Sequence, residues 1–114
     1  MQKAPEPFDI HAVYSPRDRR EKLPRADWRF LIHVAANLAA AFHAAHEAGV
    51  VIGDVNHGSV RVGKDGRVRL IDCDSYQITK DGKTLRCGVG VDAYTPPELQ
   101  GVSLADVDRT RDHD

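Results

Sequence analysis

The sequence predicts an α+β fold in which one long helix is followed by two β-hairpins and an irregular segment. Apolar residues recur at spacings of three and four across residues 26–48, the pattern of a helix with an apolar face. Short apolar runs flank two Asp-Gly pairs, Asp65-Gly66 and Asp81-Gly82, and Asp-Gly is a strong hairpin-turn signal. The length of 114 residues, with 41% hydrophobic and 29% charged residues, is typical of one soluble globular unit.

The helix expected over residues 26–48 carries its own start and stop signals. Asp27 places negative charge in the first turn, and Gly49 follows the last turn, where glycine favours helix termination. Apolar residues also lie outside the main face, so we expect this helix to be buried on several sides. These residues are Trp28, Ile32, Ala36 and Ala40.

Two histidines of this helix, His43 and His46, are three residues apart and leave two interpretations open. They are either a metal-binding pair or ordinary structural histidines. We favour structural histidines, because no carboxylate or cysteine stands at a matching ligand spacing.

The first hairpin is expected to pair residues 60–62 with 68–71, and the second to span residues 77–87. Prolines punctuate residues 1–25 and predict an extended or turning path there, with one short turn of helix expected over residues 9–14. The basic cluster within residues 17–25 is interpreted as a solvated surface.

Two acidic sites flank the first hairpin, and each follows an apolar run. Asp54 follows the run that begins at Val50, and Asp72 follows the strand that ends at Ile71. Because a hairpin brings its ends together, we expect Asp54 and Asp72 to be neighbours facing one cleft. Close carboxylates repel, and proteins tolerate this where a cation or a proton transfer requires them. The alternative is two turns with solvated aspartates.

Composition and charge narrow the classes of partner. A formal net charge of -1 gives no electrostatic case for nucleic acid or anionic membranes. Polar residues interrupt the most apolar segment, residues 30–45, which argues against a membrane span, and no secretory signal precedes it. Cys73 and Cys87 lack metal-ligand spacing, so a reduced cytoplasmic protein is expected, with a bridge between them left open.

The order of these parts resembles the lower lobe of the protein kinase superfamily. Ile52-Gly53-Asp54 stands at the family's H-R-D motif, Asp72-Cys73-Asp74 at D-F-G and Pro96-Pro97-Glu98 at A-P-E. His46 and Gly49 match the L-H-x-x-G that commonly precedes the catalytic loop. The segments V-I-G-D-V-N and L-I-D-C-D-S-Y-Q are similar in sequence to those of bacterial helix-hairpin-helix kinases.

The resemblance implies ATP and Mg²⁺ as cofactors and phosphoryl transfer to serine or threonine of a protein partner. Asp54 would be the catalytic base, and Asp72 would hold Mg²⁺ on the ATP phosphates. Asn56 and Ser59 would complete the cofactor-binding loop, with Ser59 as the second metal ligand. Residues 75–95 would form the activation segment, and Glu98 would be a structural anchor.

Departures from the family pattern qualify these roles. Ser59 replaces the usual metal-binding asparagine, and Asn56 replaces the lysine of serine/threonine kinases. Gly53 replaces the arginine that receives an activation-loop phosphate, so switching by that route is not expected. No glycine-rich phosphate loop or V-A-I-K lysine is present. Residues 1–114 are therefore expected to be a partial kinase-like domain, from the hinge to the start of the central lower-lobe helix, without the N-lobe and inactive alone.

Two other function classes remain open. One is a pseudokinase or scaffold, which binds partners without catalysis and which Ser59 and Gly53 favour. The other is a D-x-D metal-dependent phosphatase of the haloacid-dehalogenase type, or a glycosyltransferase, suggested by the apolar strand that ends at Asp72-Cys73-Asp74. The phosphatase family needs a long downstream region, and only forty residues follow Asp74.

Overall fold

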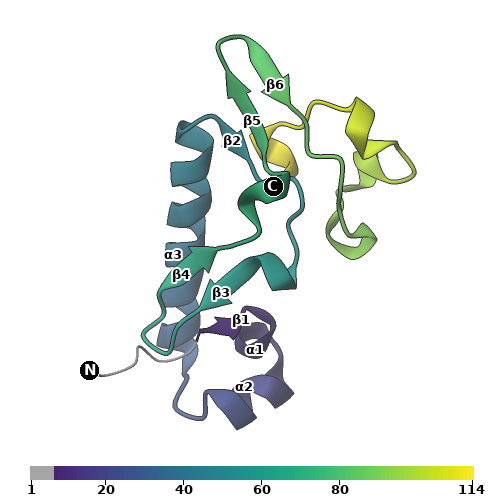
Figure 1. Ribbon diagram of the computed structural model, residues 1–114. Helices are drawn as coiled ribbons and strands as arrows, with labels where there is room; N and C mark the ends of the chain where they lie inside the picture. The colour runs from purple at the N-terminus through teal and green to yellow at the C-terminus, as the bar shows by residue number, and fades with distance from the viewer. Residues whose placement is uncertain (1–6) are drawn as a thin grey trace. The chain divides into compact units, whose positions relative to one another are not determined.

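The computed structural model describes residues 7–114, which contain mixed α and β structure with two small sheets (Figure 1). The helices are α1 (His11–Tyr14), α2 (Pro16–Lys22) and α3 (Trp28–Glu47). The strands are β1 (Phe8–Asp9), β2 (Val50–Val51), β3 (Val60–Val62), β4 (Val68–Leu70), β5 (Gln77–Lys80) and β6 (Lys83–Leu85). Two compact units result. Unit 1 comprises the described residues up to 41 together with 57–71, and unit 2 comprises 42–56 with 72–114.

The long helix predicted from the apolar periodicity is confirmed as α3. Its N-terminus is capped by Asp27, whose Oδ1 accepts a hydrogen bond from the Phe30 N–H at 3.0 Å. At its C-terminus the Gly49 N–H donates to the His46 carbonyl at 3.0 Å, and Gly49 has a φ of 79°. Glycine reaches this left-handed conformation without a Cβ clash, which ends the helix.

The expectation that α3 is buried on several sides is wrong. Val34 is its only fully buried residue within the described chain, while Trp28 is 67% and Ile32 63% exposed. For Ala36 and Ala40, which are also exposed, the error has a physical cause, because the small side chain of alanine is tolerated in water as well as in a core. Nothing in the structure explains the exposure of Trp28 and Ile32. Among residues 7–114, no helix combines the length and the apolar character needed to cross a membrane.

The sheet of unit 1 has the strand order β1-β3-β4 and contains the first predicted hairpin. β3 and β4 pair antiparallel, with Val60 opposite Leu70 and Val62 opposite Val68. Gly66, with a φ of 83°, closes the turn, and its carbonyl accepts a hydrogen bond from Asn37 Nδ2 at 2.9 Å. Valines of β3 join an apolar core. Its buried members are Val13, Leu23, Val34, Val60 and Val62.

The short helical turn expected within residues 9–14 is confirmed as α1, whereas the predicted extended or turning path is wrong between residues 16 and 22, where α2 forms; residues 1–6 lie outside the described range. Pro16 occupies the first turn of α2, where its missing N–H costs nothing. The Ser15 hydroxyl caps the helix by accepting from the Asp18 N–H at 3.5 Å. Proline here starts a helix rather than interrupting one.

The sheet of unit 2 has the order β2-β5-β6, and β5 with β6 forms the second predicted hairpin. Both residues of its turn, Asp81 and Gly82, have positive φ, at 51° and 75°, as a tight two-residue hairpin turn requires. The two cysteines are both free: Cys87 is buried and Cys73 is exposed.

Candidate active site

Asp54 lies in the loop that follows β2, directly after a γ-turn. The Asp54 N–H donates to the Ile52 carbonyl at 2.8 Å, and the residue between them, Gly53, has a φ of 74°. Asp54 is half-buried, and the Asn56 amide donates to its Oδ1 and to its carbonyl, each at 3.2 Å. The structure therefore brings together Asp54 and Asn56, two of the residues singled out by sequence.

A carboxylate that the sequence analysis did not assign, that of Asp114, anchors this loop. Its side chain is fully buried, and it accepts hydrogen bonds at 2.8 Å from the backbone N–H groups of Ile52 and Gly53 and from His46 Nε2. Charged acceptors make the stronger kind of hydrogen bond to backbone amides. The peptide units that lead into Asp54 are thereby fixed from one side.

The contact of His46 with Asp114 supports a structural role for this histidine. His46 is largely buried and hydrogen-bonded to a carboxylate, whereas His43 is exposed. Across residues 7–114, no group of three or more histidine, cysteine, aspartate or glutamate side chains is arranged to hold a metal ion. The structural interpretation of His46 is the one the geometry supports.

Asp72, the second acidic site, has a different environment. It adopts the left-handed conformation, with φ 59° and ψ 43°, directly before the 3₁₀ turn Cys73–Ser75. A non-glycine residue in this region costs of order 1–3 kcal/mol and is found most often at functional sites. Its side chain is exposed, and none of the hydrogen bonds or ion pairs seen among the described residues engages its carboxylate.

Tyr76 links Asp72 and Asp114 electrostatically. Burial raises the pKa of the Tyr76 phenol above its usual value of 10.0, and the charges of Cys73, Asp114 and Asp72 raise it further. Because Asp72 and Asp114 act on the same phenol, both lie in one region of unit 2. Asp114 also anchors the loop of Asp54, so this region is the candidate active site.

Two further predicted residues lie elsewhere. Ser59 belongs to unit 1 and is only 3% exposed, and its carbonyl accepts from the Ile71 N–H at 2.9 Å. Glu98 lies in the 3₁₀ turn Pro97–Leu99, and its Oε1 is 3.7 Å from His113 Nε2. That contact is compatible with the anchoring role expected for Glu98, although its side chain is largely exposed.

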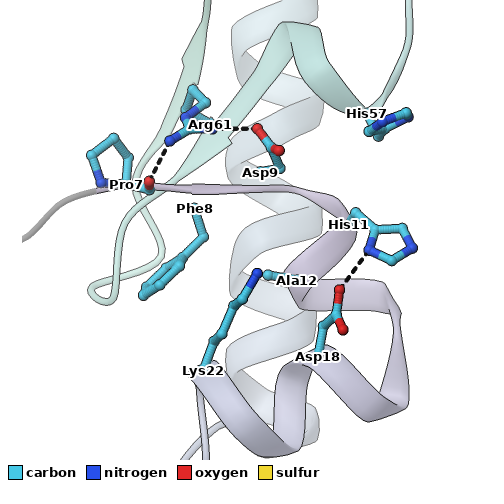
Figure 2. Close-up of a pocket in the computed structure, with 9 residues that line it drawn as sticks. All are labelled: Pro7, Phe8, Asp9, His11, Ala12, Asp18, Lys22, His57 and Arg61. Atoms are coloured by element: carbon cyan, nitrogen blue, oxygen red, sulfur yellow. Dashed lines mark hydrogen bonds and ion pairs between the residues drawn. The ribbon is translucent and has the colours of Figure 1, made fainter.

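A separate pocket of about 430 Å³ lies within unit 1, among β1, α1, α2 and β3 (Figure 2). His11 Nδ1 pairs with Asp18 Oδ2 at 2.8 Å, Arg61 pairs with Asp9, and Lys22 extends into the pocket from α2. The acids and bases of the pocket largely neutralise one another. It contains none of the four predicted site residues, namely Asp54, Asn56, Ser59 and Asp72.

Comparison with known proteins identifies curated relatives with kinase names. The chain is 49% identical over 106 residues to Protein kinase YegI of Escherichia coli strain K12, and equally to Protein kinase YegI of strain O157:H7. These alignments cover 92% of this chain but only 16% of each relative, so the chain spans about a sixth of their length. No family model matches the chain. No solved structure matches it. The similarity supports a protein-kinase-like relationship.

Proposed function

We propose that this chain supplies the catalytic and metal-binding loops of a protein-kinase-like domain, which transfers the γ-phosphate of ATP to serine or threonine of a protein. The observation that carries the proposal is the contrast between two carboxylates of unit 2. Asp54 is half-buried, hydrogen-bonded and mounted on an anchored loop, whereas Asp72 is exposed, has a left-handed backbone and makes no side-chain hydrogen bond or ion pair within residues 7–114. The kinase name of the relatives at 49% identity adds independent support.

Asp54 has the surroundings required of a base that accepts a proton from a substrate hydroxyl. The hydroxyl oxygen attacks the γ-phosphorus, the bond from phosphorus to the bridging oxygen of ADP breaks, and the hydroxyl proton passes to the Asp54 carboxylate. The Asn56 amide donates to Oδ1 of this carboxylate. The carboxylate would accept the proton at Oδ2, and the anchored backbone limits how far Asp54 can turn.

The residues present fit a bound Mg²⁺. Mg²⁺ prefers oxygen ligands, retains several waters and is usually held by one or two carboxylates together with substrate phosphates. A lone exposed carboxylate such as that of Asp72 suits this arrangement, and a cluster of three protein ligands is not needed. When bound, the ion offsets charge on the phosphates. Ser59 is buried in unit 1, and its role as second metal ligand stays a prediction.

The test compares aspartate variants in the protein expressed at its full genomic length. Asp72→Ala is expected to weaken Mg²⁺·ATP binding, because a charge that offsets the dication is removed. Asp54→Asn is expected to leave binding nearly intact and to lower phosphoryl transfer by roughly 10²–10⁴-fold, the usual effect of losing an acid–base group. The matched control is Asp81→Asn, in the exposed turn of the second hairpin, which should change neither quantity.

Ser59→Asn separates the kinase from the pseudokinase or scaffold. If Ser59 tunes a working site, restoring the amide should strengthen metal binding and raise transfer, since an amide oxygen is the better ligand. If catalysis has been lost, the substitution restores no transfer. The kinase proposal fails if the unmodified protein binds no nucleotide and Asp54→Asn and Asp72→Ala behave like it in every assay.

A further inference from the structure

Arg109 carries a buried positive charge that no carboxylate neutralises among the described residues. The residue is 5% exposed, its Nη1 donates to the Gly53 carbonyl, and its Nη2 donates to the Val89 carbonyl at 2.7 Å. Its Nε is buried without a hydrogen-bond partner in the described chain. Burying a guanidinium costs free energy, and hydrogen bonds to two carbonyl oxygens offset only part of that cost. A buried guanidinium in this setting therefore points to a role in fixing the position of the two carbonyl groups.

The backbone of Arg109 is fixed independently of its side chain. Gln77, on β5 and only 4% exposed, donates from Nε2 to the Arg109 carbonyl at 2.6 Å and accepts from the Arg109 N–H at its Oε1 at 2.8 Å. This two-bond contact resembles the pairing of neighbouring strands. The guanidinium therefore projects from a point held on the sheet of unit 2.

Gly53 leaves the space that the guanidinium fills. A Cβ at this position would lie 2.9 Å from Arg109 Nη1 and 2.8 Å from the Sγ of the buried Cys87, and the φ of 74° already favours glycine. The Gly53 carbonyl belongs to the peptide bond that joins Gly53 to Asp54. A hydrogen bond to this oxygen thus restrains the peptide unit that leads into Asp54, in addition to the hydrogen bonds that Asp114 accepts from the Ile52 and Gly53 N–H groups.

We infer that Arg109 is a positioning residue that ties the Asp54 loop to the segment containing Val89 and so orients Asp54. The role in orienting a base depends on the function proposed above; the tie itself does not. Both acceptors are main-chain carbonyls, which are present whether or not any side chain is modified. The link therefore holds the segment in place without a phosphorylated residue.

The tie is tested first in the unmodified protein by NMR. Arg109 guanidinium protons should exchange slowly with water and show couplings across hydrogen bonds to the Gly53 and Val89 carbonyl carbons. Arg111, exposed and two residues away, provides the internal control and should exchange rapidly. Rapid exchange of the Arg109 guanidinium protons, without those couplings, overturns the inference. Because this experiment uses the unmodified protein, its result does not depend on whether a variant folds.

A conservative pair of variants then tests positioning against general stability. Arg109→Lys keeps the charge but cannot donate in a fork to both carbonyls, whereas Arg111→Lys makes the same change at the surface. For Arg109→Lys we expect shifts of the Gly53 and Val89 carbonyl signals, faster thermolysin cleavage at Gly88–Val89, and protection of β3 and β4 amides as before. Arg111→Lys should resemble the unmodified protein in all three. Equal behaviour of the two variants overturns the inference.

Phosphoryl transfer distinguishes this inference from the proposed function. Arg109→Lys should lower kcat by about 10- to 100-fold, the typical effect of a small misplacement, while KM for Mg²⁺·ATP stays unchanged. An active unmodified protein in which Arg109→Lys leaves kcat unaltered contradicts the positioning role alone. An inactive unmodified protein contradicts the proposed function, and the NMR result still decides whether Arg109 makes the tie.

Discussion

The loop of residues 52–56 and the turn of residues 72–75 each present an aspartate, yet they are built in opposite ways. In the first, Asp114 accepts hydrogen bonds from the two backbone N–H groups that precede Asp54, Arg109 donates to the Gly53 carbonyl, and Asn56 donates to the Asp54 carboxylate. In the second, Asp72 has a strained left-handed backbone and an exposed carboxylate without a hydrogen-bond partner in the described chain. The same side chain is held firmly in one place and left available in the other.

This difference shows that the surroundings of a carboxylate suit it either to accept a proton or to bind a cation. A base acts within hydrogen-bond reach of one proton, so its position matters more than its freedom. A ligand for a hard cation must keep its oxygens unshared, so it benefits from the absence of competing donors.

Removing the anchor of the first loop should have the largest effect. Asp114→Ala leaves two buried backbone N–H groups and His46 without their acceptor, and we expect the free energy of unfolding to fall by about 3–5 kcal/mol. Urea titration measures this value. The control, Asp112→Ala, removes an exposed carboxylate nearby and should change stability by less than about 0.5 kcal/mol. Similar losses in both variants would contradict the anchoring role.

Filling the space at Gly53 should have the next largest effect. Gly53→Ala introduces a Cβ 2.8 Å from Cys87 Sγ at a positive φ, and we expect a loss of roughly 2–3 kcal/mol. Gly82→Ala has nearly the same φ, 75°, but no atom within 4 Å of the added Cβ, so it isolates the backbone strain at roughly 1 kcal/mol. Urea titration of both variants measures these losses. An equal loss in free energy of unfolding for Gly82→Ala and Gly53→Ala would contradict the steric role of Gly53.

At Asp72, we expect a substitution that leaves stability unchanged but weakens Mg²⁺·ATP binding. Asp72→Gly relieves the left-handed backbone strain, and the free energy of unfolding should stay within about 1 kcal/mol of the original or rise. Binding of Mg²⁺·ATP should nevertheless weaken, because the free carboxylate is gone. Asp81→Gly, at a φ of 51° in an exposed turn, should affect stability in the same way and leave binding intact. Isothermal titration of both variants checks this, and equal binding by the two would count against Asp72.

The smallest effect concerns alkaline pH. The pKa of Tyr76 is raised in the folded state, so the neutral phenol favours folding, and this contribution is complete below pH 10. As the pH rises through 10, the phenol of the unfolded state loses its proton first, and this favours unfolding. The contribution to stability is therefore lost as the pH approaches the pKa of the folded state. Tyr76→Phe should therefore flatten the fall in thermal melting temperature above pH 10. An unchanged fall in the phenylalanine variant would show that other groups cause it.

The sequence predicted the features whose signals are local. The periodicity of α3, the helix-ending Gly49 and the two Asp-Gly turns each depend on a few neighbouring residues, and the structure confirms them. Asp27 was expected inside the first turn, and it instead caps the helix from the position before it. The helix α2 was missed because Pro16 was interpreted as a break rather than a start. β1 is only two residues long and pairs with β3, more than fifty residues away, so no local pattern announces it.

The support of the candidate site could not be predicted for a related reason. Asp54 and Asp72 follow apolar runs, which is a readable signal, but the contacts of Arg109 and Asp114 that support the Asp54 loop join residues between 20 and 68 positions apart. Nothing near Asp114 or Arg109 marks it as buried, since both stand in a polar stretch rich in aspartate and arginine. Only the fold brings such residues to the Asp54 loop.

The most direct test of the central claim uses Mn²⁺ in place of Mg²⁺ as a paramagnetic probe. Titration of Mn²⁺·ATP into the isotopically labelled protein should broaden the amide signals of residues 72–74 first and those of residues 54–56 next, because under the proposed function Asp72 would hold the metal and Asp54 would face the reacting phosphate. In Asp72→Ala both sets should stay sharp at the same metal concentration. Broadening that is absent, or that persists unchanged in Asp72→Ala, would contradict the division of roles between the two aspartates.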